Sequence, residues 1–174
     1  EVLYRWAQLK FLLQEEKEGI SKLRQASSLT SDPGIWLLLL EKESLASEPL
    51  FLDDYHKFLV FATAQDKEQA MVYRVRYQLQ GKEYQAAHAG IEELLGSKYK
   101  PIRAQAQFLK GYKLYLQQDY EQAVPELLRV RYLYPENSNT RVEAEAYACL
   151  AYLAAGKITE ADQLYEVIHP DLPP

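Results

Sequence analysis

Apolar residues recur along the chain with the period of an α-helix, in segments separated by short polar breaks. Three of these breaks are QGK at 80–82, QQD at 117–119 and AGK at 155–157, and each supplies turn residues or an N-cap for the segment that follows. Prolines at 135 and 173 follow two of the segments, where a helix cannot continue. The pattern therefore predicts an all-α protein of about ten helices in antiparallel pairs.

The stretch GYKLYLQQDYEQAVPELLRVRYLYP at 111–135 recurs in a related form. Moved on by 38 residues, its small and apolar residues meet similar ones: Gly111 meets Cys149, Tyr120 meets Ile158, Ala123 meets Ala161, Leu127 meets Tyr165 and Pro135 meets Pro173. Moved back by 36 residues, Tyr120 meets Tyr84, Ala123 meets Ala87 and Leu127 meets Ile91. Small residues at fixed places let two antiparallel helices approach closely, so the recurrence predicts stacked helix pairs. Pro125 lies inside one predicted helix, where we expect a slight bend and no break.

These two stretches, 111–135 and CLAYLAAGKITEADQLYEVIHPDLP at 149–173, resemble tetratricopeptide repeats (TPR) of bacterial type. The resemblance implies a right-handed solenoid and covers repeats at 66–100, 101–138 and 139–174. Residues 1–64 contribute two degenerate helix pairs, so that 1–174 form a single domain. The tryptophan usual in this family is replaced by Met71, Gln107 and Glu145. The stretch NSNT at 137–140 is interpreted as an insertion that lengthens the usual spacing.

Composition narrows the choice of partners. The chain has 174 residues with a formal net charge of −5, so it lacks the positive field that attracts nucleic acid. The longest apolar runs, at 35–40 and 58–62, are far shorter than the roughly 20 residues needed to cross a bilayer. We therefore expect no nucleic-acid partner and no membrane span.

Residues that could perform chemistry are scattered. His56, His88 and His169 are far apart in sequence and have no metal-ligand spacing with Cys149, the one cysteine, which occupies a small-residue position of its repeat. The acids at 14–18, 53–54 and 92–93 are typical of solvated helix faces. No glycine begins a phosphate-binding loop. The sequence therefore predicts no catalytic residue, no cofactor and no metal site, and a protein that is not an enzyme.

The resemblance implies that the first helices of successive pairs line a concave groove that binds a peptide or a partner protein. Tyr and Arg often anchor such interfaces. The candidate residues are Gln69, Tyr73, Arg76, Gln80, Gln105, Phe108, Tyr112 and Tyr115. Aromatic residues at 108, 112 and 115 stand where chaperone-tail clamps of this family carry lysine, asparagine and arginine, which argues against that subtype. For each tyrosine, packing between neighbouring repeats is an equal alternative.

Two other functions stay open. The chain could be a helical docking domain cut from a larger enzyme, since it begins at Glu1 within an amphipathic pattern and we expect it to be a piece of a longer or processed protein. It could also be a structural protein that self-assembles by homotypic stacking through its C-terminal repeat. The stretch 129–157 resembles repeats of bacterial envelope proteins, which favours the periplasm or cell envelope slightly over the cytoplasm.

Overall fold

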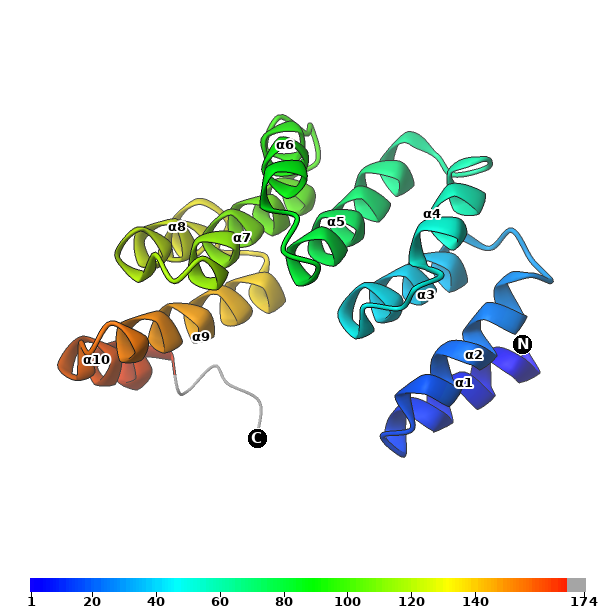
Figure 1. The fold of residues 1–174 in the computed structure, drawn as a ribbon, viewed down its shortest axis with the longest axis horizontal. Helices are drawn as coiled ribbons and strands as arrows, with labels where there is room; N and C mark the ends of the chain where they lie inside the picture. Colours follow the sequence, from blue (N-terminus) through cyan, green and yellow to red (C-terminus); the bar gives the residue numbers. More distant parts are fainter. Residues whose placement is uncertain (169–174) are drawn as a thin grey trace. The chain divides into compact units, whose positions relative to one another are not determined.

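The protein is described by a computed structural model, which places residues 1–168. These residues form ten α-helices and no strand, so the predicted all-α class and number of helices are confirmed (Figure 1). The chain divides into two compact units, Glu1–Lys82 and Glu83–Pro174. Within the described part, none of the helices combines the length and the apolar character that a bilayer span requires. The predicted roles of His169 and Pro173 lie outside the described residues.

The first unit contains five helices. They are α1 (Val2–Leu12), α2 (Glu16–Ser27), α3 (Pro33–Ala46), α4 (Phe51–Leu59) and α5 (Ala64–Gln80). Asp32 caps α3 by accepting a hydrogen bond from the Gly34 amide at 2.8 Å, and Thr63 and Asp66 form a reciprocal capping box at the start of α5. Contacts between α3 and α5 show that packing here extends beyond consecutive helices.

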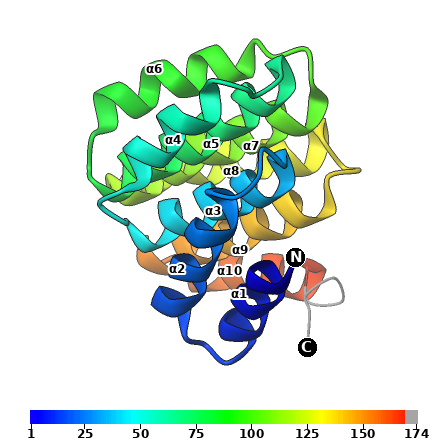
Figure 2. The same ribbon diagram turned by 90° about the vertical axis from the view of Figure 1, so that its right-hand side faces the viewer.

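The second unit also contains five helices. They are α6 (Tyr84–Leu95), α7 (Lys100–Leu116), α8 (Tyr120–Leu133), α9 (Ser138–Ala154) and α10 (Ile158–Ile168). In this unit α7 packs against α6, α8 and α9, and α9 packs in turn against α8 and α10. Two views show α9 beside α10, as they show α1 beside α2 in the other unit (Figure 1 and Figure 2).

The turns inside the helix pairs repeat the same backbone conformation. Gln14, Gln118 and Gly156 have φ values of 60°, 64° and 75°, in the left-handed region. The amide of the next residue in each case donates to a carbonyl five residues earlier: Glu15 to Lys10 at 2.9 Å, Asp119 to Leu114 at 3.0 Å and Lys157 to Tyr152 at 2.9 Å. This is the hydrogen bond of a Schellman motif, so three pairs turn in the same way. Lys82, between α5 and α6, also has a positive φ, of 60°.

Small residues lie where the paired helices approach most closely, as the recurrence predicted. A Cβ atom on Gly111 would lie 2.6 Å from Cγ of Leu127, and one on Gly19 would lie 2.6 Å from the Phe11 ring. Ala123 and Ala161 are buried at the corresponding place in α8 and α10. Cys149 donates weakly from its thiol to the Ala161 carbonyl, with sulfur and oxygen 3.9 Å apart.

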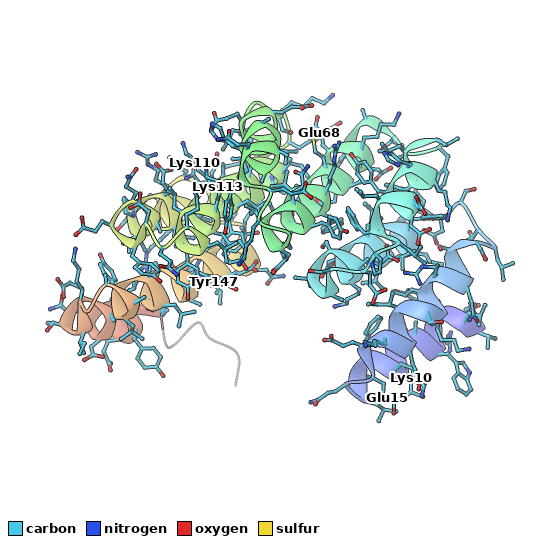
Figure 3. The ribbon with its side chains drawn as sticks, in the orientation of Figure 1. Lys10, Glu15, Glu68, Lys110, Lys113 and Tyr147 are labelled. Atoms are coloured by element: carbon cyan, nitrogen blue, oxygen red, sulfur yellow. The ribbon has the colours of Figure 1, made fainter. Side chains whose placement is uncertain are left out.

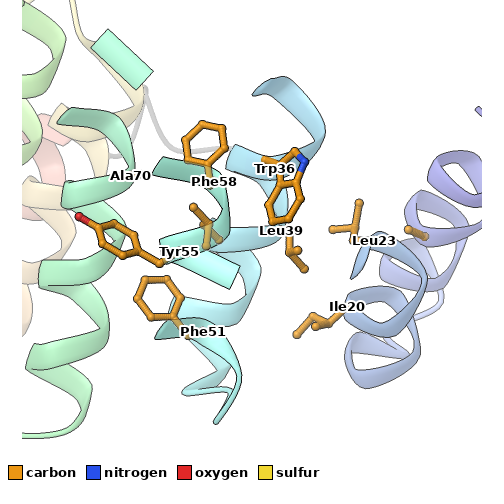
Figure 4. Packing of buried hydrophobic residues seen from close by; sticks show 10 residues of the cluster. Ile20, Leu23, Trp36, Leu39, Phe51, Tyr55, Phe58 and Ala70 are labelled. Atoms are coloured by element: carbon orange, nitrogen blue, oxygen red, sulfur yellow. The ribbon is translucent and has the colours of Figure 1, made fainter. Parts of the chain in front are cut away.

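A cluster of aromatic and aliphatic side chains forms the core of the first unit (Figure 4). Trp36 of α3 stacks on Phe58 of α4 with ring centroids 6.3 Å apart, and Phe51 of α4 stacks on Tyr77 of α5 at 4.6 Å. The indole Nε1 of Trp36 donates to the Thr30 carbonyl at 2.9 Å, which satisfies its polar group. The helix pairs expected in residues 1–64 are degenerate in sequence, and packing of aromatic side chains forms much of their core.

The structure bears on three details of the sequence interpretation. First, the stretch 137–140, interpreted as an insertion, lies at the start of a helix: Asn137 is the N-cap of α9 and the next three residues form its first turn. The longer spacing is accompanied by long first helices, since α5, α7 and α9 each have 17 residues. Second, the boundary between the units follows Lys82, so the two helices expected as the pair in 66–100 belong to different units. Pro125 lies within a continuous α8, so the expected absence of a break is confirmed.

Candidate binding surface

Three aromatic residues of α7 and one of α9 form the strongest candidate site, which we call the α7–α9 aromatic surface. Phe108, Tyr112 and Tyr115 share one face of α7 because they are spaced by four and three residues. Their rings stack in order, with centroids 5.6 Å apart for Phe108–Tyr112 and 6.4 Å apart for Tyr112–Tyr115. Tyr147 of α9, which is labelled in Figure 3, lies against all three, at centroid distances of 5.8, 4.8 and 5.4 Å.

These four residues differ in solvent exposure: two are buried and support the cluster, and two form an edge that a partner can reach. Phe108 and Tyr112 are only 1% and 8% exposed, so the expectation that they are exposed in a groove is wrong. The physical reason is that α9 packs against α7 and brings the Tyr147 ring over them. Tyr115 and Tyr147 are half-buried, and a partner could reach both. The packing alternative therefore describes Phe108 and Tyr112, while Tyr115 keeps an accessible edge.

The hydroxyl of Tyr147 is neutral. Burial raises the pKa of Tyr147 to about 12, and the nearby Tyr112, Glu143 and Tyr115 add to the effect. A neutral phenol both donates and accepts a hydrogen bond, whereas a phenolate only accepts. The edge thus combines the area of the tyrosine rings with a hydroxyl that can both donate and accept a hydrogen bond. This combination suits a peptide backbone or a neutral polar side chain.

Two buried polar contacts fix the helices that carry the surface. Gln107 of α7 donates from Nε2 to both the backbone carbonyl and the carboxylate of Glu126, each at 2.9 Å. Glu145 of α9 is fully buried and accepts from Arg131 of α8 at 3.1 Å. These are two of the positions where the family resemblance would place tryptophan. Polar links between helices occupy them instead, and they hold α7 and α9 against α8.

The remaining candidates divide by unit. In the second unit, Gln105 of α7 is half-buried. In the first unit, Tyr73 of α5 packs beside the core, where burial together with Glu41 raises its pKa to about 12. Gln69 and Arg76 are half-buried and Gln80 is exposed. Of the two sets, the one in the second unit contains the candidates that form one aromatic cluster.

Sequence reasoning missed a buried charge cluster in the first unit. Glu43 of α3 and Asp54 of α4 are 0% and 2% exposed, although 53–54 was expected to be a solvated acidic pair. Arg24 of α2 lies between them: it donates to Asp54 at 2.9 Å and to Glu43. Lys57 donates to Asp54 at 2.7 Å. The signal was present in α4, because Asp54 has helical spacing with the apolar Phe51 and Phe58.

The pKa values of the two carboxyl groups in this cluster are shifted in opposite directions. Burial is the main cause that raises the pKa of Glu43, to about 7, against the opposing effect of Arg24. Burial also acts on Asp54, but hydrogen bonds from Lys57 and Arg24 outweigh it and hold the pKa of Asp54 below its ordinary value. Asp54, Arg24 and Lys57 line a cavity of about 690 Å³ with Trp36 and Phe61. Both cations already contact Asp54, so the cavity offers a ligand no uncommitted charge.

The residues considered for catalysis do not come together. His56 and His88 are exposed, and no group of three His, Cys, Asp or Glu side chains in the described part of the chain is arranged to hold a metal ion. Cys149 is partly buried, and burial followed by the charge of Glu145 raises the pKa of its thiol. A raised thiol pKa reduces the thiolate, which is the nucleophilic form.

Comparison of the sequence with protein-family models, with curated proteins and with solved structures finds no match in any of the three.

Proposed function

We propose that this protein is a non-catalytic interaction scaffold, built as a right-handed solenoid of the TPR type. Support for the architecture comes from the repeated Schellman turns at Gln14, Gln118 and Gly156. The helix starts support it as well, since both α7 and α9 and also α8 and α10 begin 38 residues apart. In such a solenoid the first helices of successive pairs form the inner, ligand-binding side.

The binding site of the scaffold is the α7–α9 aromatic surface, and its ligand is a segment of a partner protein. The observation that carries this proposal is the half-buried edge of Tyr115 and Tyr147, supported by the buried rings of Phe108 and Tyr112. Side chains that are already fixed by stacking lose little conformational entropy when a ligand binds. Tyrosine also contributes large contact area with a hydrogen-bonding end, which is why it often dominates binding energy.

The test is a comparison of Tyr115→Ala with Tyr132→Ala. Tyr132 of α8 is 76% exposed and has no part in the aromatic surface, so it matches the chemistry of the substitution without touching the site. Immobilised parent and variants would be used to capture proteins from a lysate of the source organism, and the affinity of each captured partner would then be measured by calorimetry. We expect Tyr115→Ala to weaken binding at least about tenfold, and Tyr132→Ala to leave it unchanged.

Tyr147→Phe separates the ring from the hydroxyl. It keeps the contacts with the α7 rings, so circular dichroism should match that of the parent, while a partner that bonds the hydroxyl should bind several-fold more weakly. Equal binding by the parent and Tyr115→Ala, with both folded, would contradict the proposed site.

A further inference from the structure

The second unit shows how a helix pair is covered by the first helix of the pair that follows. Tyr112 and Tyr115 of α7 point to α9, where Tyr147 covers them. Counted 38 residues onward, the same positions of α9 are Leu150 and Leu153. These leucines are 45% and 50% exposed. The face of α9 that would meet a following first helix is therefore apolar and open.

The first unit presents the complementary face on α1. Val2, Trp6, Leu9 and Leu13 are spaced by four, three and four residues, which places them in one stripe along the helix, and each is about half exposed or more. Ala7 is fully buried on the opposite side, toward the rest of the unit. We call Val2, Trp6, Leu9 and Leu13 the α1 stripe.

The register of the α1 stripe matches a buried face of α9. Val2, Trp6 and Leu9 lie 12, 8 and 5 residues before Gln14, the left-handed residue of their turn. Ala144, Ala148 and Ala151 lie at the same distances before Gly156, and all three are fully buried. On α9 these alanines lie between the positions of Tyr147 and Glu145, which contact α7 and α8. The α1 stripe is thus the face with which a first helix packs on the pair before it.

Charge complements the apolar match. Helix α1 contains two bases, Arg5 and Lys10, and no acid, whereas α10 contains Glu160, Asp162 and Glu166 and no base. Lys10 forms ion pairs with Glu15, both labelled in Figure 3, and with Glu18, all within its own helix pair. Among the residues that the structure describes, Arg5 pairs only with the exposed Glu1, at 2.6 Å, and such a surface pair contributes little to stability. Arg5 can therefore exchange that partner for an acid of α10.

We propose that copies of this protein associate head to tail, with the α1 stripe of one copy packed on Leu150 and Leu153 of the next. The proposal commits to a second copy because the chain itself carries both halves of the contact in matching register and with opposite charge. Leu150 lies three residues after Tyr147 on α9. The blocking substitutions described below leave all four residues of the aromatic surface unchanged, so this proposal and the proposed binding site can fail or hold separately. A contact of this kind is heterologous, so each copy uses two different surfaces.

The test uses two variants that each block one surface. Trp6→Glu/Leu9→Glu blocks the α1 stripe, and Leu150→Glu/Leu153→Glu blocks the α9 leucines; all four residues are exposed, so the folds should persist in circular dichroism. In sedimentation over a range of concentrations we expect the mean mass of the parent to rise and each variant to stay monomeric. An equimolar mixture of the two variants should form a one-to-one dimer and nothing larger, because only one pair of intact surfaces remains.

Fluorescence gives an independent readout at the contact. In the mixture, Trp6 is present only in the variant whose leucines are blocked, and its emission should shift to shorter wavelength as the other variant is added. Trp36 is 6% exposed and should not respond. Val60→Glu, at a residue 86% exposed and outside both surfaces, is the control and should assemble like the parent. A parent that stays monomeric, or a dimer lost by only one of the two blocking variants, would overturn the proposal.

Discussion

Gly111 lies so close to Leu127 that a methyl group on the glycine would overlap the leucine side chain, with 2.6 Å between Cβ and Cγ. Gly111→Ala is therefore expected to lower the free energy of unfolding of the second unit by about 1–3 kcal/mol, although alanine favours helix. Hydrogen exchange of peptides from α7 and α8, followed by mass spectrometry, measures this change in the unit itself.

The matched control for this prediction is a double-mutant cycle. Leu127→Ala alone removes a fully buried side chain and should cost about 2–5 kcal/mol. In Gly111→Ala/Leu127→Ala the new methyl group fills part of the space, so the combined loss should be smaller than the sum of the two single losses. Simple additivity would show that the close approach is relieved in another way.

The buried carboxyl of Glu43 predicts an unusual dependence of stability on pH. Its pKa in the folded state, about 7, exceeds the ordinary value of 4.5, so the folded state binds the proton more tightly. This contribution to stability is fully present below pH 4.5 and is lost as the pH rises through about 7. The shift corresponds to about 3 kcal/mol. Asp54, with its lowered pKa, loses its contribution only at pH values below its ordinary 3.8, so the two effects are well separated.

Glu43→Gln isolates this effect because glutamine keeps a carbonyl oxygen for Arg24 and cannot ionise. Urea unfolding would be followed by tryptophan fluorescence, which reports on the first unit because Trp6 and Trp36 both lie in it. We expect the parent to be less stable at pH 8 than at pH 5, and the variant to be nearly equal at both. A parent whose stability is unchanged between these pH values would show that Glu43 is ionised throughout.

The thiol of Cys149 should react slowly. Burial raises its pKa, so the thiolate fraction at pH 8 is below that of free cysteine. With a disulfide-exchange reagent we expect a rate at least about fivefold below that of free cysteine. The same reaction in urea should proceed at the ordinary rate, and the single cysteine makes the signal unambiguous. A fast reaction in the folded protein would reopen a nucleophilic role for this residue.

The sequence correctly predicted features that depend on interactions between residues close together in the chain. The breaks at 80–82, 117–119 and 155–157 coincide with the turns after α5, α7 and α9, because turn residues and caps act within a few positions. Asp119 caps α8, with its carboxylate accepting from the Gln122 amide at 3.4 Å. The positions of Gly111 and Ala123 also followed from local spacing, since a helix pair can close only over small side chains.

The sequence was less informative where burial depends on distant helices. Whether Tyr112 is exposed depends on the Tyr147 ring, which lies 35 positions later in the chain. Likewise, Glu43 and Asp54 resemble surface acids until Arg24 of α2 is placed between them. Periodicity predicts which face of a helix is inward, but the partner that satisfies a polar group on that face is set by tertiary packing.

The left-handed turn shared by Gln118 and Gly156 predicts opposite effects on stability for opposite substitutions at the two positions. Gln118 has a φ of 64° in a conformation that Gly156 adopts without strain at 75°. Gln118→Gly should raise the free energy of unfolding of the second unit by about 1 kcal/mol, and Gly156→Ala should lower it by about the same amount. No atom lies within 4 Å of a Cβ added to Gly156, so its cost comes from the backbone alone. The control is Gln117→Gly at the preceding residue, where φ is −80° and glycine should only destabilise. Hydrogen exchange in α8 and α10 measures all three variants, and a stabilising Gly156→Ala would contradict the assigned turn.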